Sequence, residues 1–114
     1  MAKVDLSFLS AFTRGDNAKM KKYIGMFLES APEQLGLMEK YCEEKNWHLL
    51  KVTAHSLKPQ MNYMGIAELE HTIKDIEFFA GAETKLEELP EKIAFCKAGC
   101  YKAMDLLKNE LSKL

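Results

Sequence analysis

Residues 46–65, NWHLLKVTAHSLKPQMNYMG, carry an apolar pattern at helical spacing. The apolar positions advance by four, three, four and three residues, which is the spacing of a buried helix face in a bundle. These positions are Leu50, Ala54, Leu57, Met61 and Met64. Asn46 is placed to cap the first turn, and Gly65 is placed to end the last one. The stretch therefore predicts one amphipathic helix with a face in the core.

A polar stripe runs along the other face of this predicted helix. Its members advance by three, four, three and four residues: His48, Lys51, His55, Lys58 and Asn62. His55 therefore points to water, with one lysine a turn before it and another a turn after it. Two nearby cations disfavour the charged imidazolium and bias the ring toward its neutral, nucleophilic form. Such a ring suits attack on a phosphoryl group whose oxygens the lysines can hold.

The residues around His55 resemble the signature of histidine-containing phosphotransfer (HPt) domains from bacterial multistep phosphorelays. In that family a histidine is followed by any residue, an apolar residue, a lysine and usually a glycine, with another glycine six residues later. The corresponding residues here are His55, Ser56, Leu57, Lys58, Pro59 and Gly65. In length and helix order the resemblance covers nearly the whole chain.

The resemblance implies the reaction and the partners. His55 would attack the aspartyl phosphate of a response-regulator receiver domain through Nε2, and a second receiver would then take the phosphoryl group. The receiver would supply Mg²⁺, so no cofactor is expected in this chain, and a hybrid sensor histidine kinase is a further candidate partner. Because no nucleotide-binding glycine loop or kinase segment is present, the chain should not phosphorylate itself from ATP.

Residues near His55 are assigned supporting roles. Lys58, Lys51 and Asn62 are expected to support the phosphoryl group, with the family motif adding weight to Lys58. A second stripe beside His55 is expected to dock a receiver, with an apolar centre and a polar rim that suit a helix with an acidic border. The docking residues are Val52, Ser56, Pro59, Gln60 and Tyr63.

Pro59 departs from the family pattern, which usually has glycine there. A proline lacks an N–H, and its ring crowds the carbonyl four residues earlier, which belongs to His55. We therefore expect a kink at the active residue, with room for a partner to close over the ring. The alternative is that the helix ends near Lys58.

The remaining sequence predicts an all-α fold, an up-down-up-down four-helix bundle with a short extra N-terminal helix. Asp5 and Asp16 are placed to cap the short helix and the long helix that follows it. The apolar spacing of the long helix continues across Pro32, so one kinked helix is expected there. Further helices are expected over about 67–80 and from 91 to the end. Thr84 and Glu87 form a possible capping box before the last helix.

Length and composition limit the classes of protein. The chain of 114 residues has 47% hydrophobic residues and a net charge of −1, which fits one compact domain over 1–114, expected to be monomeric. Neither a transmembrane run nor a leader is apparent, so we expect a cytoplasmic protein that binds neither membrane nor nucleic acid. Three cysteines lie at apolar positions, which indicates buried thiols and no metal site.

Two other interpretations stay open. One is a helical adaptor that binds a partner through the His55 face without phosphorylation. The other is the dimerisation and histidine domain of a sensor kinase, although that domain builds its bundle from two-helix hairpins of two chains. Among the other histidines, His71 lies near Glu68 and Asp75, which favour its charged form, and His48 is expected to be an ordinary solvated side chain.

Overall fold

The helices predicted from the sequence are all present in the computed structural model, which describes residues 3–114. The α-helices are α1 (Ser7–Phe12), α2 (Asn17–Glu43), α3 (Trp47–Tyr63), α4 (Glu70–Ala82) and α5 (Leu89–Ser112). Single 3₁₀ turns, η1 (Ala67–Leu69) and η2 (Leu86–Glu88), precede α4 and α5. The described residues contain no strand. The expected all-α class is confirmed.

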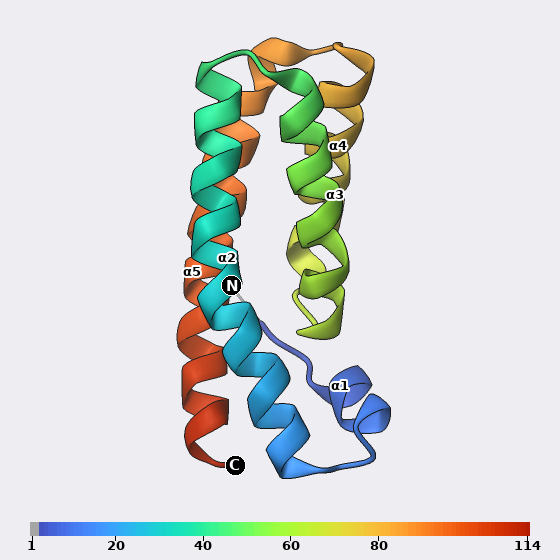
Figure 1. Cartoon of the computed structure of the whole chain (residues 1–114), viewed down its shortest axis with the longest axis vertical. Coiled ribbons are helices and arrows are strands. Elements are labelled where there is room, and N and C mark those ends of the chain that lie inside the picture. The colour runs from blue at the N-terminus through green and yellow to red at the C-terminus, as the bar shows by residue number, and fades with distance from the viewer. Residues whose placement is uncertain (1–2) are drawn as a thin grey trace.

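Helices α2 to α5 form an up-down-up-down bundle about 42 Å long, in which each helix packs against its two neighbours in the ring. Figure 1 shows that α2 and α5 are longer than α3 and α4 and extend beyond them at one end. The short helix α1 lies at that end, below α3. All four long helices come from one chain, so the bundle does not require a second copy, unlike the hairpin of a sensor kinase.

The apolar positions predicted from spacing are the core of the bundle. Leu50, Ala54, Leu57, Met61 and Met64 of the central stretch are all at most 2% exposed. The corresponding positions of the other helices join them, among them Ile24, Leu35, Ile73, Ile76, Cys96 and Leu107. Hydrophobic burial of this kind, at about 25 cal/mol per Å² of apolar surface, is the main force that holds such helices together.

Helix ends follow the predicted caps in α2 and α3 but not in α5. The Asp16 carboxylate accepts a hydrogen bond from the Lys19 N–H at 3.1 Å, and the Asn46 side chain accepts one from the Leu49 N–H at 3.2 Å. The predicted capping box of Thr84 and Glu87 is wrong, because neither η2 nor α5 has a side-chain cap. A left-handed residue, Lys85 at φ 50°, instead turns the chain into η2.

Pro32 and Pro59 lie in the interior of continuous helices, whereas Pro90 lies in the first turn of α5. Helix α2 runs through Pro32, as predicted, and α3 runs through Pro59 as far as Tyr63. The alternative that the central helix ends near Lys58 is therefore wrong, while the kink at His55 stays a prediction. Helix α4 ends at Ala82, two residues beyond the end expected from the sequence, and the next residue, Glu83, takes a left-handed conformation.

The N-terminal segment is fixed to the bundle at the turn between α3 and α4. Gly65 has φ 67°, and a Cβ at this position would overlap the backbone carbonyl of Asp5. The Asp5 N–H donates to the Gly65 carbonyl at 3.2 Å, and the Asp5 carboxylate accepts a hydrogen bond from the Ser7 N–H. Asp5 thus stabilises the start of α1, although Leu6 is the capping residue. Gly65 is required for both the turn and the close approach.

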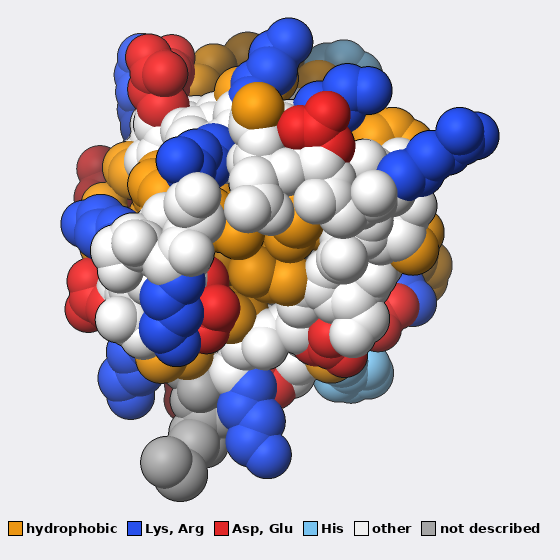
Figure 2. Space-filling model, turned by 90° about the horizontal axis from the view of Figure 1, so that it is seen from below, with side chains coloured by type: hydrophobic (Ala, Val, Ile, Leu, Met, Phe, Trp, Pro, Cys, Tyr) orange, Lys and Arg blue, Asp and Glu red, His pale blue; other side chains and the backbone are white. Residues whose placement is uncertain are grey.

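The end of the bundle near α1 is partly open. Figure 2 views the molecule from this end and shows hydrophobic side chains at the centre of a face that also carries charged groups. A cavity of about 470 Å³ at this end is lined by Leu6, Met20 and Leu114 among others. Among the described residues, no helix is long and apolar enough to cross a membrane.

Candidate functional site

His55 lies on the solvent face of α3, as the polar stripe predicted. Its side chain is 69% exposed, while Ala54 and Leu57 on the same helix are fully buried. Burial of these neighbours fixes the rotation of α3 about its axis. The ring is therefore presented to solvent by a helix whose orientation the core determines.

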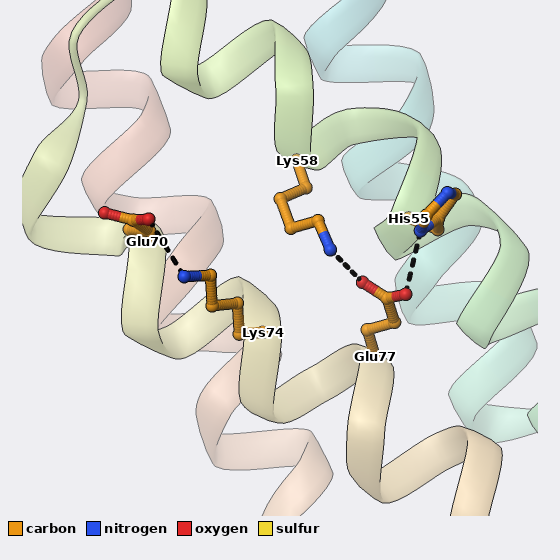
Figure 3. A network of polar contacts seen from close by, with 5 residues as sticks. All are labelled: His55, Lys58, Glu70, Lys74 and Glu77. Carbon is orange, nitrogen blue, oxygen red and sulfur yellow. Dashed lines mark hydrogen bonds and ion pairs between the residues drawn. The ribbon is translucent and has the colours of Figure 1, made fainter.

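A carboxylate from the neighbouring helix contacts both His55 and Lys58 (Figure 3). Glu77 of α4 lies 2.8 Å from Nδ1 of His55 through Oε2, and Oε1 accepts a hydrogen bond from Nζ of Lys58, also at 2.8 Å. The side chains of Glu77 and Lys58 are only 19% and 26% exposed. One carboxylate therefore joins the exposed ring to a half-buried cation across the α3–α4 contact.

Hydrogen-bond chemistry decides which ring nitrogen carries the proton. The hydrogen bond from Lys58, followed by that from His55, lowers the pKa of Glu77, so the carboxyl group is ionised at neutral pH. An ionised carboxylate only accepts hydrogen bonds, so Nδ1 of His55 must be the donor. In a neutral ring, Nε2 then keeps its lone pair and is the free nitrogen. The arrangement presents Nε2 as a nucleophile.

This geometry corrects the electrostatic argument made from the sequence. We expected the ring to have lysine ammonium groups as its charged neighbours, but the group in contact with it is the Glu77 carboxylate. Lys58 approaches the site by bonding the same carboxylate. The proton held at Nδ1 therefore explains why Nε2 is the free nitrogen of the neutral ring, and the contact that the ring makes is with an anion rather than with two cations.

Comparison with known proteins identifies the family. The Hpt domain family model matches residues 22–114, which is most of the chain. The chain belongs to the Hpt domain family. Its role is accordingly histidine phosphotransfer in a phosphorelay, and the adaptor alternative is not favoured. Comparison with curated protein sequences gave no match.

A solved structure supports the fold of this Hpt domain over almost its full length. The chain is similar to the crystal structure of histidine-containing phosphotransfer protein B (HptB) from Pseudomonas aeruginosa PAO1, with a TM-score of 0.87. The match covers 97% of this chain and 96% of that chain at 21% sequence identity. It thus includes α1, which lies before the residues matched by the family model.

The expected docking stripe of the Hpt domain lies at the surface beside His55. Val52 is 47% exposed and Tyr63 is 41% exposed, and Ser56 and Pro59 are exposed as well. Gln60 differs from expectation because it is half-buried. Its Oε1 accepts a hydrogen bond from the Ser30 hydroxyl at 3.1 Å, and its Nε2 donates to the Ser56 carbonyl at 3.2 Å. Gln60 is therefore fixed against α2 and is not a mobile rim residue.

Two phenylalanines of α1 extend this stripe into an apolar surface that the sequence did not reveal. Phe8 and Phe12 are 54% and 55% exposed, and their ring centroids lie 5.3 and 5.9 Å from that of Tyr63. Phe12 also contacts Tyr23 of α2, at 5.7 Å. We define Phe8, Phe12, Val52, Pro59 and Tyr63 as the apolar patch. It covers α1 and α3, and at helical spacing its α3 members lie on the other side of His55 from Lys51 and Lys58.

The other predicted supporting residues, Lys51 and Asn62, form no hydrogen bond or ion pair with His55 in the described part of the chain. Lys51 lies on the α4 side of α3, where its stem lies close to Gly81. Asn62 is exposed two turns beyond His55, about 10 Å along the helix axis. Neither makes a side-chain hydrogen bond or ion pair within residues 3–114. Their roles toward a phosphoryl group stay predictions.

The remaining histidines and the cysteines lie outside the site. Nε2 of His71 is 3.4 Å from the Asp75 carboxylate, which was one of its expected neighbours, and His48 is exposed. Cys96 and Cys100 are fully buried as expected, whereas Cys42 is only partly buried. The hydrogen bond with Cys96, followed by burial, raises the pKa of the Cys100 thiol. Among the described residues, no group of three or more His, Cys, Asp or Glu side chains could hold a metal ion.

Proposed function

We propose that His55 accepts a phosphoryl group from the aspartyl phosphate of a receiver domain and passes it to the aspartate of another receiver. The Nε2 lone pair attacks phosphorus, the bond between phosphorus and the aspartyl oxygen breaks, and the receiver's aspartate leaves as a carboxylate. The observation that supports this best is the hydrogen bond from Nδ1 to Glu77, which makes Nε2 the free nitrogen of the neutral ring on a side chain that is 69% exposed.

Glu77 acts in this proposal as a positioning residue. It holds the proton at Nδ1 and fixes the plane of the ring. When Nε2 bonds to phosphorus, the ring gains positive charge, because Nδ1 keeps its proton. The carboxylate at 2.8 Å stabilises that charge as it develops, in the way that a buried or half-buried acid orients and supports a catalytic histidine elsewhere.

Lys58 supports the phosphorylated state. A phosphoryl group carries about two negative charges near neutral pH and offers three strong acceptor oxygens. Lys58 stands one helical turn after His55, and its ammonium is already held on the ring's side by Glu77. If the Lys58 ammonium donates to a phosphoryl oxygen in place of Glu77, it stabilises phosphorylated His55. Lys51 and Asn62 are proposed to add weaker support from the same face.

The apolar patch is proposed as the surface on which the receiver docks. It is contiguous with His55 on α3, and the rings of Phe8 and Phe12 pack against that of Tyr63. Aromatic side chains of this kind supply most of the binding free energy in many protein interfaces. Mg²⁺ is expected to arrive with the receiver, since the groups proposed to act on this chain do not together form a typical set of Mg²⁺ ligands. The chain is proposed to act as a monomer in the cytoplasm, with a hybrid sensor kinase as a further partner.

The test is transfer from a phosphorylated receiver domain, followed by mapping of the label by mass spectrometry. Label that is acid-labile, base-stable and confined to His55 is expected. His55→Gln should abolish it, while His48→Gln and His71→Gln serve as matched controls and should retain it. Label on His48 or His71 in the His55→Gln variant would contradict the assignment.

A further inference from the structure

A second feature lies beside His55, on the side away from the apolar patch. A cleft of about 520 Å³ opens between α3 and α4, and three lysines from the two helices line it. These are Lys51 and Lys58 from α3 and Lys74 from α4. Glu77 is the only carboxylate in the lining, and Phe78 adds an aromatic ring.

The cleft keeps a positive charge after its ion pairs are counted. Glu77 balances Lys58, and Glu70, from outside the lining, pairs with Lys74 at 3.0 Å. The side chains of Lys74 and Glu70 are 56% and 45% exposed, so their ion pair adds little to stability, and Lys74 can exchange Glu70 for a carboxylate of a partner. Lys51 has no ion-pair partner within residues 3–114. Because the whole chain has a net charge of −1, the positive charge of this cleft is a local property of the surface between α3 and α4.

Gly81 allows Lys51 to lie in this cleft. A Cβ at position 81 would stand 3.0 Å from Cδ and 3.4 Å from Cε of Lys51. A glycine late in α4 is unfavourable for the helix, because alanine is the better helix former by about 1 kcal/mol. At this position it leaves room for the lysine stem to cross the face of α4. The helix therefore gives up some stability at the place where the lysine needs space.

Phe78 gives the cleft an apolar contact. Its ring is 64% exposed, although it contacts Phe79, with ring centroids 6.2 Å apart. A partner segment that suits these neighbours carries carboxylates toward the lysines and an apolar side chain toward the ring. Charged groups at such a site mainly accelerate and orient association, whereas a buried aromatic ring slows dissociation.

We propose that this cleft is a second docking subsite for the receiver, and that it binds a carboxylate-bearing segment of that partner. The inference rests on the proposed function and extends it. The apolar patch and the cleft lie on opposite sides of His55, so a receiver bound to both straddles α3. With the patch on one side of the ring and the cleft on the other, the bound receiver is oriented, and so is the direction from which the phosphoryl group approaches Nε2.

The test measures binding and transfer with the receiver domain that phosphorylates the wild-type chain fastest in a panel. Lys74→Gln should lower the association rate constant about threefold in 50 mM salt, and 0.5 M salt should remove the difference. Phe78→Ala should weaken affinity about fivefold, mainly through faster dissociation. Gly81→Ala should weaken affinity about threefold by displacing Lys51, without loss of helix content.

Matched controls make the same kinds of substitution outside the cleft. Lys102→Gln removes an exposed lysine from α5, and Gly36→Ala adds a methyl group on α2 where nothing lies within 4 Å. Both should bind as the wild type does. If the three cleft variants behave like these two controls, the subsite is excluded, although transfer to His55 still stands. If the proposed function is wrong, the result is different, because the wild-type chain then takes no phosphoryl group from any receiver.

A small phosphoryl donor separates docking from chemistry. Phosphoramidate can phosphorylate an imidazole without a protein interface, so its labelling of His55 should be the same in Lys74→Gln, Phe78→Ala and the wild type within about twofold. If labelling by phosphoramidate falls in parallel with transfer from the receiver, the cleft acts on the reactivity of His55 and the docking proposal is wrong.

Discussion

Glu77 accepts a hydrogen bond from Nδ1 of His55 at 2.8 Å, although the two residues lie 22 positions apart and on different helices. The bond crosses the contact between α3 and α4, so the reactive ring depends on the packing of the bundle as well as on its own helix. Because the same carboxylate also accepts a hydrogen bond from Lys58, Glu77 decides the tautomer and orientation of the ring and also holds the nearby cation.

Glu77→Gln should slow phosphotransfer to His55 about 10-fold to 100-fold, because a hydrogen bond to a charged group is worth about 1.5–3 kcal/mol. The amide still fits the space but no longer stabilises the positive charge of the phosphorylated ring. ¹⁵N shifts of the imidazole should show the Nδ1–H tautomer in the wild type and a mixture in the variant. An unchanged tautomer together with an unchanged rate would remove Glu77 from the mechanism.

Lys58→Met should slow transfer and shorten the lifetime of phosphohistidine, because it removes the cation while keeping most of the apolar stem. The expected cost to the free energy of unfolding is at most about 1 kcal/mol, as for a partly exposed ion pair. Lys92→Met is a matched control, since Lys92 is also 26% exposed and pairs with a carboxylate of α4, Asp75, at 3.1 Å. Equal lifetimes in the two variants would show that Lys58 serves the fold alone.

The free energy of unfolding should depend on pH through Glu77. Its pKa in the folded chain is lowered, first by Lys58 and then by His55, so the folded state favours the ionised carboxyl group. The resulting stabilisation is complete above the ordinary carboxyl pKa and is lost as pH falls through the lower, folded value. Urea unfolding between pH 7 and pH 3 should show that the difference between wild type and Glu77→Gln shrinks with acidification. A difference that stays constant with pH would contradict this linkage.

The sequence contained the information for the helices and for His55, because both follow from local spacing. Leu50, Ala54 and Leu57 define the buried face, and a histidine four residues after Lys51 must then lie on the opposite side. Caps such as Asn46 act within one turn, so they too could be read from neighbouring residues.

Glu77 and the rings of α1 could not be placed by the same reasoning. Contact between Glu77 and His55 depends on the register of α4 against α3, which the turn at Gly65 and the 3₁₀ turn η1 determine together. The available signal was the pair of polar residues Lys74 and Glu77, which lie three residues apart on one face of α4. Phe8 and Phe12 have the spacing of core residues, but the end of the bundle offers no helix to cover them.

Val52→Asp should weaken receiver binding by more than about 1 kcal/mol without unfolding the bundle, because Val52 is 47% exposed and contributes only to the outer surface. Tyr63→Asp should weaken binding by at least as much, and it should also shift the amide signals of α1, since Tyr63 contacts Phe8 and Phe12. Calorimetric titration with the receiver gives the affinity. If both variants bind normally, the apolar patch is not the interface.

Gly65→Ala should both destabilise the fold and weaken docking, because the glycine is required by the turn and by the close approach of Asp5. Gly15→Ala is the matched control, since Gly15 also has a left-handed φ, of 73°, but nothing lies within 4 Å of a Cβ there. The control should cost about 1 kcal/mol for the conformation alone. Gly65→Ala should cost about 1–3 kcal/mol more, because the methyl group displaces the N-terminal segment. With that segment displaced, Phe8 and Phe12 lose their contact with Tyr63, so receiver affinity should fall in the same variant. Equal unfolding free energies for the two variants would show that the N-terminal segment is not fixed at this turn.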